Sequence, residues 1–132
     1  MTIVLVALGG AVGATARYTL DRAITAAAGA SIPYGTLLIN VSGSFAAGLA
    51  IALLTAHDTD PRWRLLLVTG FLGGYTTFSA FSVETLTLFE RGQPLRAVVY
   101  LFSTNALALT ACLLGLLLAR SLAPHASLTL TP

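Results

Sequence analysis

The stretch GFLGGYTTFSAFSVE, at residues 70–84, lies midway along the third of four long apolar segments. It carries three glycines, two adjacent threonines, two serines and a carboxylate, where a bilayer interior favours Leu and Val. Small and hydroxyl residues at this depth allow a helix to break, because the freed backbone groups bond to side chains, water or neighbouring helices. The stretch therefore predicts either an ion site on a broken helix or a face for close helix packing.

The composition indicates an all-α integral membrane protein. Of the 132 residues, 56% are hydrophobic and 9% are charged, and the mean hydropathy is +0.86. Soluble domains contain about 25% charged residues. All seven basic residues are arginines, and because they are scattered no nucleic-acid partner is expected. Cys112 is alone in an apolar run, which excludes a disulfide scaffold and indicates a small buried hydrophobe.

Four segments are long and apolar enough to cross a bilayer, which takes about 20 residues. They are predicted at 2–28, 34–56, 63–90 and 95–122 in a single domain over 1–132, with a polar tail at 123–132. At a rise of about 1.5 Å per residue, the third is too long for one straight crossing, so we expect a break near its middle, at the glycines. The N-terminus has no basic region, so we expect the first helix to be retained.

The arginines are nearly balanced between the two ends of the four spans. Three lie on one side and four on the other: Arg62, Arg64 and Arg120 against Arg17, Arg22, Arg91 and Arg96. Because the Lys/Arg bias sets orientation, this balance predicts insertion both ways up, unless a stronger local signal overrides the count. Two opposed copies would then form an antiparallel, dual-topology homodimer.

Polar side chains within the second and fourth segments fall on helical stripes. Thr36, Asn40 and Ser44 are spaced i, i+4, i+8, and Tyr100 and Thr104 are spaced i, i+4. Their N–H and O–H donors suit a dehydrated anion. An interhelical hydrogen-bond ladder, which needs no transported ion, explains the same spacing.

Two aromatic and two charged residues complete the candidates for an ion path. Phe78 and Phe81 share a helix face, which indicates either core packing or positive ring edges turned toward an anion. Glu84 follows on nearly the same side, as a vestibule group or as the partner of an arginine such as Arg17. Arg17 lies near the end of the first segment, where it attracts anions or extends to the lipid headgroups.

The remaining motifs carry no catalytic chemistry. Gly9 and Gly13 form a G-x-x-x-G face for close helix packing. His57 and His125 are isolated and outside the spans. There is no metal-ligand cluster, nucleophile–base pair or phosphate-binding motif, so an enzyme is not expected.

Three motifs resemble those of the Fluc fluoride channels, also called CrcB proteins. They are GGAVGATARY at 9–18, GTLLINVSG at 35–43 and the stretch at 70–84, and the resemblance covers essentially the whole chain. It implies an antiparallel, dual-topology homodimer in the cell inner membrane, embedded in lipid. Such a dimer is a passive and highly selective fluoride channel with two pores, which exports cytoplasmic fluoride and protects against its toxicity.

The resemblance also implies roles for single residues. Pore or fluoride contacts would be made by Asn40, Phe78, Phe81, Thr36, Thr77, Ser79, Tyr100 and Thr104. Arg17 and Glu84 would lie in a vestibule. The backbone carbonyls of Gly73 and Thr76 from both subunits would hold a structural Na⁺ at the dimer centre. Ala108 departs from the family pattern, which continues the polar track of the fourth helix with a hydroxyl.

Two other functions fit a small four-span protein. A small multidrug-type transporter is also built from four spans in an antiparallel dimer, but it would need a Glu within the first helix for proton coupling, and segment 2–28 contains none. A non-transporting assembly subunit is the second alternative. Fluoride efflux from liposomes separates all three.

Overall fold

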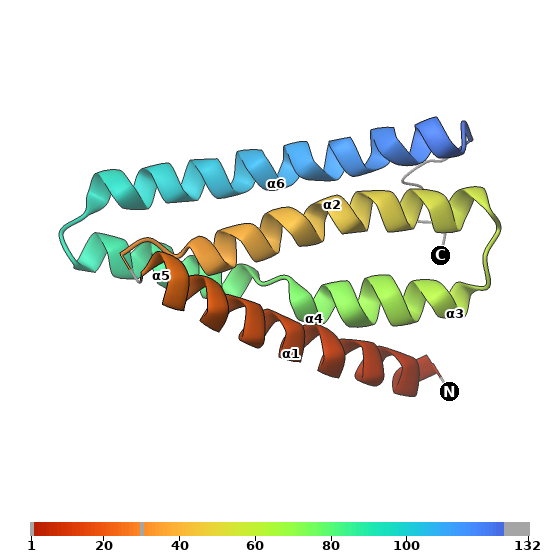
Figure 1. Ribbon diagram of the computed structural model, residues 1–132, viewed down its shortest axis with the longest axis horizontal. Coiled ribbons are helices and arrows are strands. Elements are labelled where there is room, and N and C mark those ends of the chain that lie inside the picture. Colours follow the sequence, from red (N-terminus) through yellow and green to blue (C-terminus); the bar gives the residue numbers. More distant parts are fainter. Residues whose placement is uncertain (1, 30, 126–132) are drawn as a thin grey trace.

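Four antiparallel helical crossings form the molecule, as shown by the computed structural model, which describes residues 2–29 and 31–125. The first, second and fourth crossings are single helices: α1 (Thr2–Ala28), α2 (Tyr34–Ala56) and α6 (Pro94–Leu122). The third crossing is composite: α3 (Pro61–Arg64), η1 (Leu65–Leu72), α4 (Gly73–Tyr75) and α5 (Phe78–Glu90). In Figure 1, α2 lies between α6 and the third crossing, and α1 crosses beside the third crossing.

All four crossings are long and apolar enough to span a bilayer, which confirms the predicted all-α membrane fold. The third begins at Pro61, two residues before its predicted start, because the Asp60 carboxylate accepts a 2.9 Å hydrogen bond from the Arg62 N–H. The fourth begins at Pro94, since proline fits the first turn of a helix. Of the predicted polar tail, residues 126–132 lie outside the described residues.

The third crossing breaks at Thr76 and Thr77, whose backbones are extended, with ψ of 158° at Thr76 and φ of −151° at Thr77. The predicted break is therefore confirmed, but its predicted position at the glycines is wrong. Gly73 has ordinary helical angles, φ −63° and ψ −36°, and lies with Gly74 in the helix before the break. The preceding η1 is π-helical, and short π-helical stretches often mark functional sites.

The glycines serve instead to bring α1 against the third crossing. A Cβ atom on Gly13 would collide with the Phe71 carbonyl and lie 2.9 Å from the Tyr75 nitrogen. A Cβ atom on Gly74 would lie 3.0 Å from the Gly10 Cα. The two backbones approach more closely than any side chain permits, as in other small-residue membrane interfaces. This contact confirms the packing role predicted for Gly9 and Gly13.

Helices α2 and α6 also pack closely through glycines. A Cβ atom on Gly48 would collide with the Cys112 carbonyl, and one on Gly115 with the Phe45 carbonyl. Further along, Ala52, Leu116 and Ala119 form a buried apolar cluster. Cys112 is half-buried at this contact rather than fully buried. The small residues hold α2 and α6 together along their length and leave the polar stripes of both helices facing the broken crossing.

We expect Gly13→Ala to destabilise the protein, because its added methyl group meets only backbone atoms of the third crossing. Overpacking of this kind costs about 1–3 kcal/mol. Gly10→Ala is the matched control, since the nearest atom to its Cβ, the Gly70 carbonyl oxygen, is 3.9 Å away. The apparent melting temperature of the two purified variants in detergent measures the effect. Equal melting temperatures would contradict this account of α1 docking.

Candidate functional site

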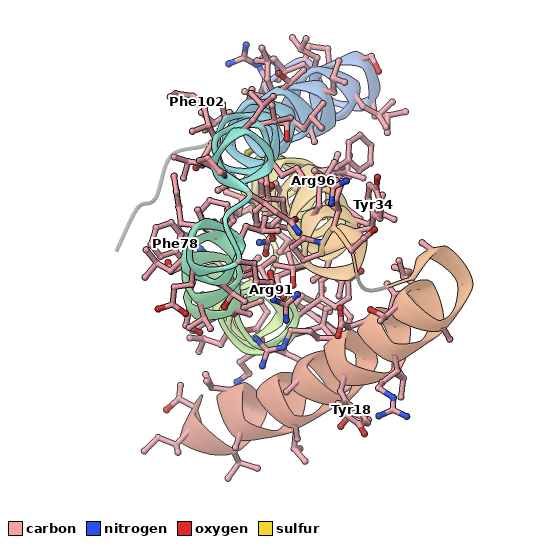
Figure 2. The ribbon with its side chains drawn as sticks, turned by 90° about the vertical axis from the view of Figure 1, so that its left-hand side faces the viewer. Tyr18, Tyr34, Phe78, Arg91, Arg96 and Phe102 are labelled. Atoms are coloured by element: carbon pink, nitrogen blue, oxygen red, sulfur yellow. The ribbon has the colours of Figure 1, made fainter. Side chains whose placement is uncertain are left out.

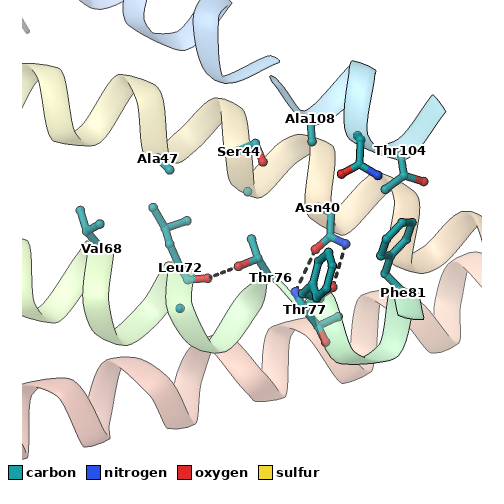
Figure 3. Close-up of a pocket in the computed structure, with 14 residues that line it drawn as sticks. Asn40, Ser44, Ala47, Val68, Leu72, Thr76, Thr77, Phe81, Thr104 and Ala108 are labelled. Atoms are coloured by element: carbon teal, nitrogen blue, oxygen red, sulfur yellow. Dashed lines mark hydrogen bonds between the residues drawn. The ribbon is translucent and has the colours of Figure 1, made fainter. Parts of the chain in front are cut away.

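A cavity of about 400 Å³ lies beside the break, between α2, the third crossing and α6 (Figure 3). None of its 14 lining residues is charged. The cavity brings together residues predicted separately from three segments of the sequence. They are Asn40, Gly73, Thr76, Thr77, Phe78, Phe81 and Thr104.

Asn40 binds the backbone at the break through both ends of its amide. Its Oδ1 accepts a 2.8 Å hydrogen bond from the Thr77 N–H, and its Nδ2 donates to the Thr77 carbonyl at 2.9 Å (Figure 3). The backbone N–H and C=O of the extended residue Thr77 are both hydrogen-bonded, as they would be to a neighbouring β-strand. Asn40 thus stabilises the broken backbone, a role that its position in the sequence did not reveal. One N–H of its amide remains available to a ligand.

The hydroxyl groups around the break differ in whether they have hydrogen-bond partners. Thr77 Oγ1 caps α5 by accepting from the Ala80 N–H, and it lies 3.2 Å from Ser79 Oγ. Thr104, across the cavity on α6, is 4% exposed, and its Oγ1 has no hydrogen-bond partner among the described residues. A buried hydroxyl without a partner costs about 1–3 kcal/mol, so the Thr104 hydroxyl is a donor available to a ligand in the cavity.

Three aromatic rings form a row, in which Phe78 and Phe81 line the cavity and Tyr100 lies next to Phe81 outside it. The ring centroids of Phe78 and Phe81 are 5.5 Å apart, and those of Phe81 and Tyr100 are 5.4 Å apart. Phe81 is 3% exposed, whereas Phe78 is 74% exposed and points outward from α5 in Figure 2. The two phenylalanines share the cavity, as expected from their spacing, but they differ in burial. Tilted rings present their positive edges to a neighbour, which suits an anion passing along the row.

Beyond the aromatic row, Glu84 accepts hydrogen bonds from two predicted site residues. Its two carboxylate oxygens receive the Thr36 and Tyr100 hydroxyls, both at 2.8 Å. This group of three lies next to a second cavity of about 210 Å³, which Glu84 lines together with Asp21 and Arg91. One hydroxyl of α2 and one of α6 therefore bind the same carboxylate.

Of the two roles expected for Glu84, the pairing with an arginine such as Arg17 is not found within the described ranges. Arg17 Nη1 instead donates to the Thr76 carbonyl at 3.5 Å, and both carboxylate oxygens of Glu84 accept from hydroxyl groups of α2 and α6. The guanidinium is half-buried at the middle of the crossing. Arg17 thus carries positive charge to the break rather than to the headgroup region.

The break takes away the helical hydrogen-bond donors of the two carbonyls predicted to hold Na⁺. In a continuous helix the Gly73 carbonyl would accept from the Thr77 N–H, but that N–H bonds to Asn40. The Thr76 carbonyl would accept from the Ala80 N–H, which bonds to Thr77 Oγ1. Neutral carbonyl oxygens suit an alkali cation. Both oxygens are of the right kind, but the Thr76 carbonyl already accepts from the Arg17 guanidinium, so a cation bound by that oxygen would compete with Arg17. Two oxygens of one chain form only part of a coordination shell.

The fold and the cavity define a class: a small multi-pass helical membrane protein with a broken-helix site for an ion. Comparison with known proteins gives the family. The family model "CrcB-like protein, Camphor Resistance (CrcB)" matches residues 4–116. The chain belongs to this family.

Several relatives bear the name fluoride-specific ion channel FluC. The one from Acidobacterium capsulatum is 50% identical over 88% of this chain and 94% of its own length. Those from Solibacter usitatus and a Roseiflexus species are 48% and 45% identical, and the matches cover 91% and 92% of this chain and 99% of each relative.

Replacing Asn40 with Leu should lower stability, because the Thr77 N–H and carbonyl lose their partners in an apolar surrounding. Unsatisfied groups of this kind cost about 1–3 kcal/mol each. Ser44→Ala, one turn along α2 in the same cavity, is the control, since the Ser44 hydroxyl has no hydrogen-bond partner within residues 2–29 and 31–125. Thermal unfolding of both variants measures the difference. A melting temperature for Asn40→Leu as high as that of Ser44→Ala would refute the proposed support of the break.

Proposed function

We propose that this chain is a fluoride-specific ion channel. The observation that carries the proposal is an uncharged cavity at a helix break, furnished with amide and hydroxyl donors and aromatic edges, in a chain closely related to proteins of that name. Fluoride is small and strongly hydrated, so a pore must replace its water with protein donors. The activity is ion transport, not an enzymatic reaction.

The neutral character of the cavity explains how an ion passes without being trapped. Conduction requires binding that is favourable enough for entry and weak enough for exit. Donors such as the Thr104 hydroxyl and the remaining Asn40 N–H stabilise an anion without the full charge of Lys or Arg. Positive charge from Arg17 lies nearby, at the Thr76 carbonyl, where it attracts anions toward the break.

Transport of this kind is passive and protects the cell. Fluoride enters as neutral HF, ionises at the higher cytoplasmic pH, and leaves through the channel of the inner membrane. A negative interior drives the anion out with about 2.3 kcal/mol per charge for each 100 mV. No coupling ion or nucleotide is required.

A second, antiparallel copy completes the channel in this proposal. The side of the molecule beside the cavity exposes Gly73, Phe78 and Ser79 near the middle of the spans. Polar groups facing lipid are costly, so a partner subunit is a better cover than acyl chains. The near balance of arginines between the two ends favours opposed orientations, and two-fold symmetry then gives two pores.

The same dimer would complete a structural Na⁺ site. The Gly73 and Thr76 carbonyls of two opposed copies would supply four oxygens on the symmetry axis. The bound cation would stabilise the paired breaks and balance the carbonyl dipoles that meet there. The multidrug-type alternative is not favoured, because the relatives are fluoride channels and α1 offers no Glu for proton coupling.

Reconstituted wild-type protein should release fluoride from liposomes. Phe78→Ile and Phe81→Ile should each slow this release by about tenfold or more. Losing about one or two kcal/mol of ion stabilisation changes a rate by that order. Isoleucine keeps bulk and apolarity but removes the positive ring edge. A fluoride electrode measures efflux, and melting temperature is recorded on the same samples.

Phe102→Ile is the matched control, because Phe102 is exposed on α6 and does not line the cavity (Figure 2). Its efflux should equal that of the wild type. Normal efflux from both cavity variants would remove the pore-lining role of the rings. A wild-type protein that released no fluoride would refute the channel itself.

Exhaustive replacement of Na⁺ by a large organic cation should lower both fluoride flux and melting temperature, because the paired carbonyls would lose the cation between them. K⁺ should restore them less well than Na⁺, since the carbonyl cage has a fixed size. The Na⁺ titration of melting temperature gives an apparent affinity independent of transport. Indifference of both flux and stability to the cation would contradict the Na⁺ site.

A further inference from the structure

We propose that Asn105 is a second amide donor on the ion path, on the α6 wall of the cavity, and that it acts together with the neighbouring Thr104 hydroxyl. This inference rests on the proposed function as a fluoride channel, and it names a further residue that contributes a hydrogen-bond donor to the transported ion. Asn40 contributes its amide from α2, and Asn105 contributes another from α6.

The hydrogen bonds of Asn105 leave most of its amide free. Its Nδ2 donates one N–H to the Leu101 carbonyl at 2.7 Å, one turn back in the same helix. The second N–H and Oδ1 have no hydrogen-bond partner among the described residues. The side chain lies in the interior of a membrane-spanning helix and is exposed, which is costly unless it meets an ion, water or another polar group.

Thr104 supplies an independent indication of a ligand at this wall. It is the residue next to Asn105, it lines the same cavity, and its buried Oγ1 has no partner in the described part of the chain. A hydroxyl buried without a partner is rare in native structures unless a ligand or water satisfies it. The free N–H of Asn105 and the O–H of Thr104 are two neutral donors in adjacent positions.

The next turn of α6 offers no donor of its own. Ala108 lines the cavity at i+4 from Thr104 and i+3 from Asn105, so it is a helical neighbour of each of them. Its methyl group cannot donate to an anion. On α6, Asn105 is therefore the donor that lies one turn from this part of the wall, beside the Thr104 hydroxyl.

An anion is the ligand that this pair fits best. The free N–H of Asn105 and the O–H of Thr104 can both donate to an anion, and none of the 14 residues that line the cavity carries a charge. Fluoride that loses water on entry would gain the N–H and O–H of the α6 wall on one side. Because both donors are neutral, the ion leaves again without the penalty of breaking an ion pair.

The test compares Asn105→Leu and Asn105→Asp with the wild type in fluoride efflux from liposomes. Leucine keeps the volume but removes the donors, and we expect efflux about tenfold slower. Aspartate keeps the shape, replaces the donors with negative charge and should be slower still. Asn105→Gln retains the amide and should keep the larger part of the activity. Ser103→Ala, adjacent in α6 but outside this cavity, should match the wild type.

A double variant with Thr104→Val separates joint action from independent effects. If both groups hold the same ion, the combined loss will be smaller than the product of the single losses. Melting temperature and dimer content by size exclusion should stay near the wild-type values for Asn105→Leu. Loss of dimer in parallel with flux would assign Asn105 to subunit contact and overturn the proposal.

Unchanged efflux from Asn105→Leu would overturn it as well. Wild-type efflux is the reference in every comparison, so failure of the channel function and failure of the Asn105 assignment give different results. The first abolishes wild-type fluoride release. The second leaves wild-type release intact and the leucine variant equal to it.

Discussion

The pairing of the Asn40 amide with the Thr77 backbone is the interaction on which the rest of the site depends. A membrane interior offers no water to an interrupted helix, and each unpaired backbone group there costs several kcal/mol. By taking both polar groups of Thr77, Asn40 allows an extended segment at that depth. The same pairing withdraws the Thr77 N–H from the Gly73 carbonyl and so leaves that oxygen free for another partner.

Close packing of glycines fixes where this interruption lies in space. Gly70 and Gly74 bring the third crossing against the glycines of α1, backbone to backbone. That contact also carries Arg17 to the Thr76 carbonyl, the second carbonyl that loses its helical donor at the break. Helices on both sides of the break therefore position an irregular segment whose polar groups bond to α1, α2 and the adjoining helices.

Neutral polar groups lie around the cavity at the break, and the nearest carboxylate lies outside it. The cavity at the break contains amides, hydroxyls and aromatic rings but no charged side chain. Glu84 lies beyond the aromatic row and receives two hydroxyl donors, from Thr36 and Tyr100. A negative group is thereby kept out of the cavity wall, while hydrogen bonding reduces the cost of its burial. This order suits passage of an anion through the neutral part of the site.

The sequence by itself determined the four crossings, the existence of a break and most members of the cavity wall. Segment length, apolar composition and mid-span Asn and Thr residues are local features that the bilayer constrains strongly. It did not determine that the break falls at Thr76 and Thr77 instead of the glycines, or that Arg17 and Glu84 have different partners. Those outcomes depend on which backbone faces meet between α1, α2 and the third crossing. Only the tertiary structure decides them, because a glycine permits both a break and a close contact, and its neighbours select one.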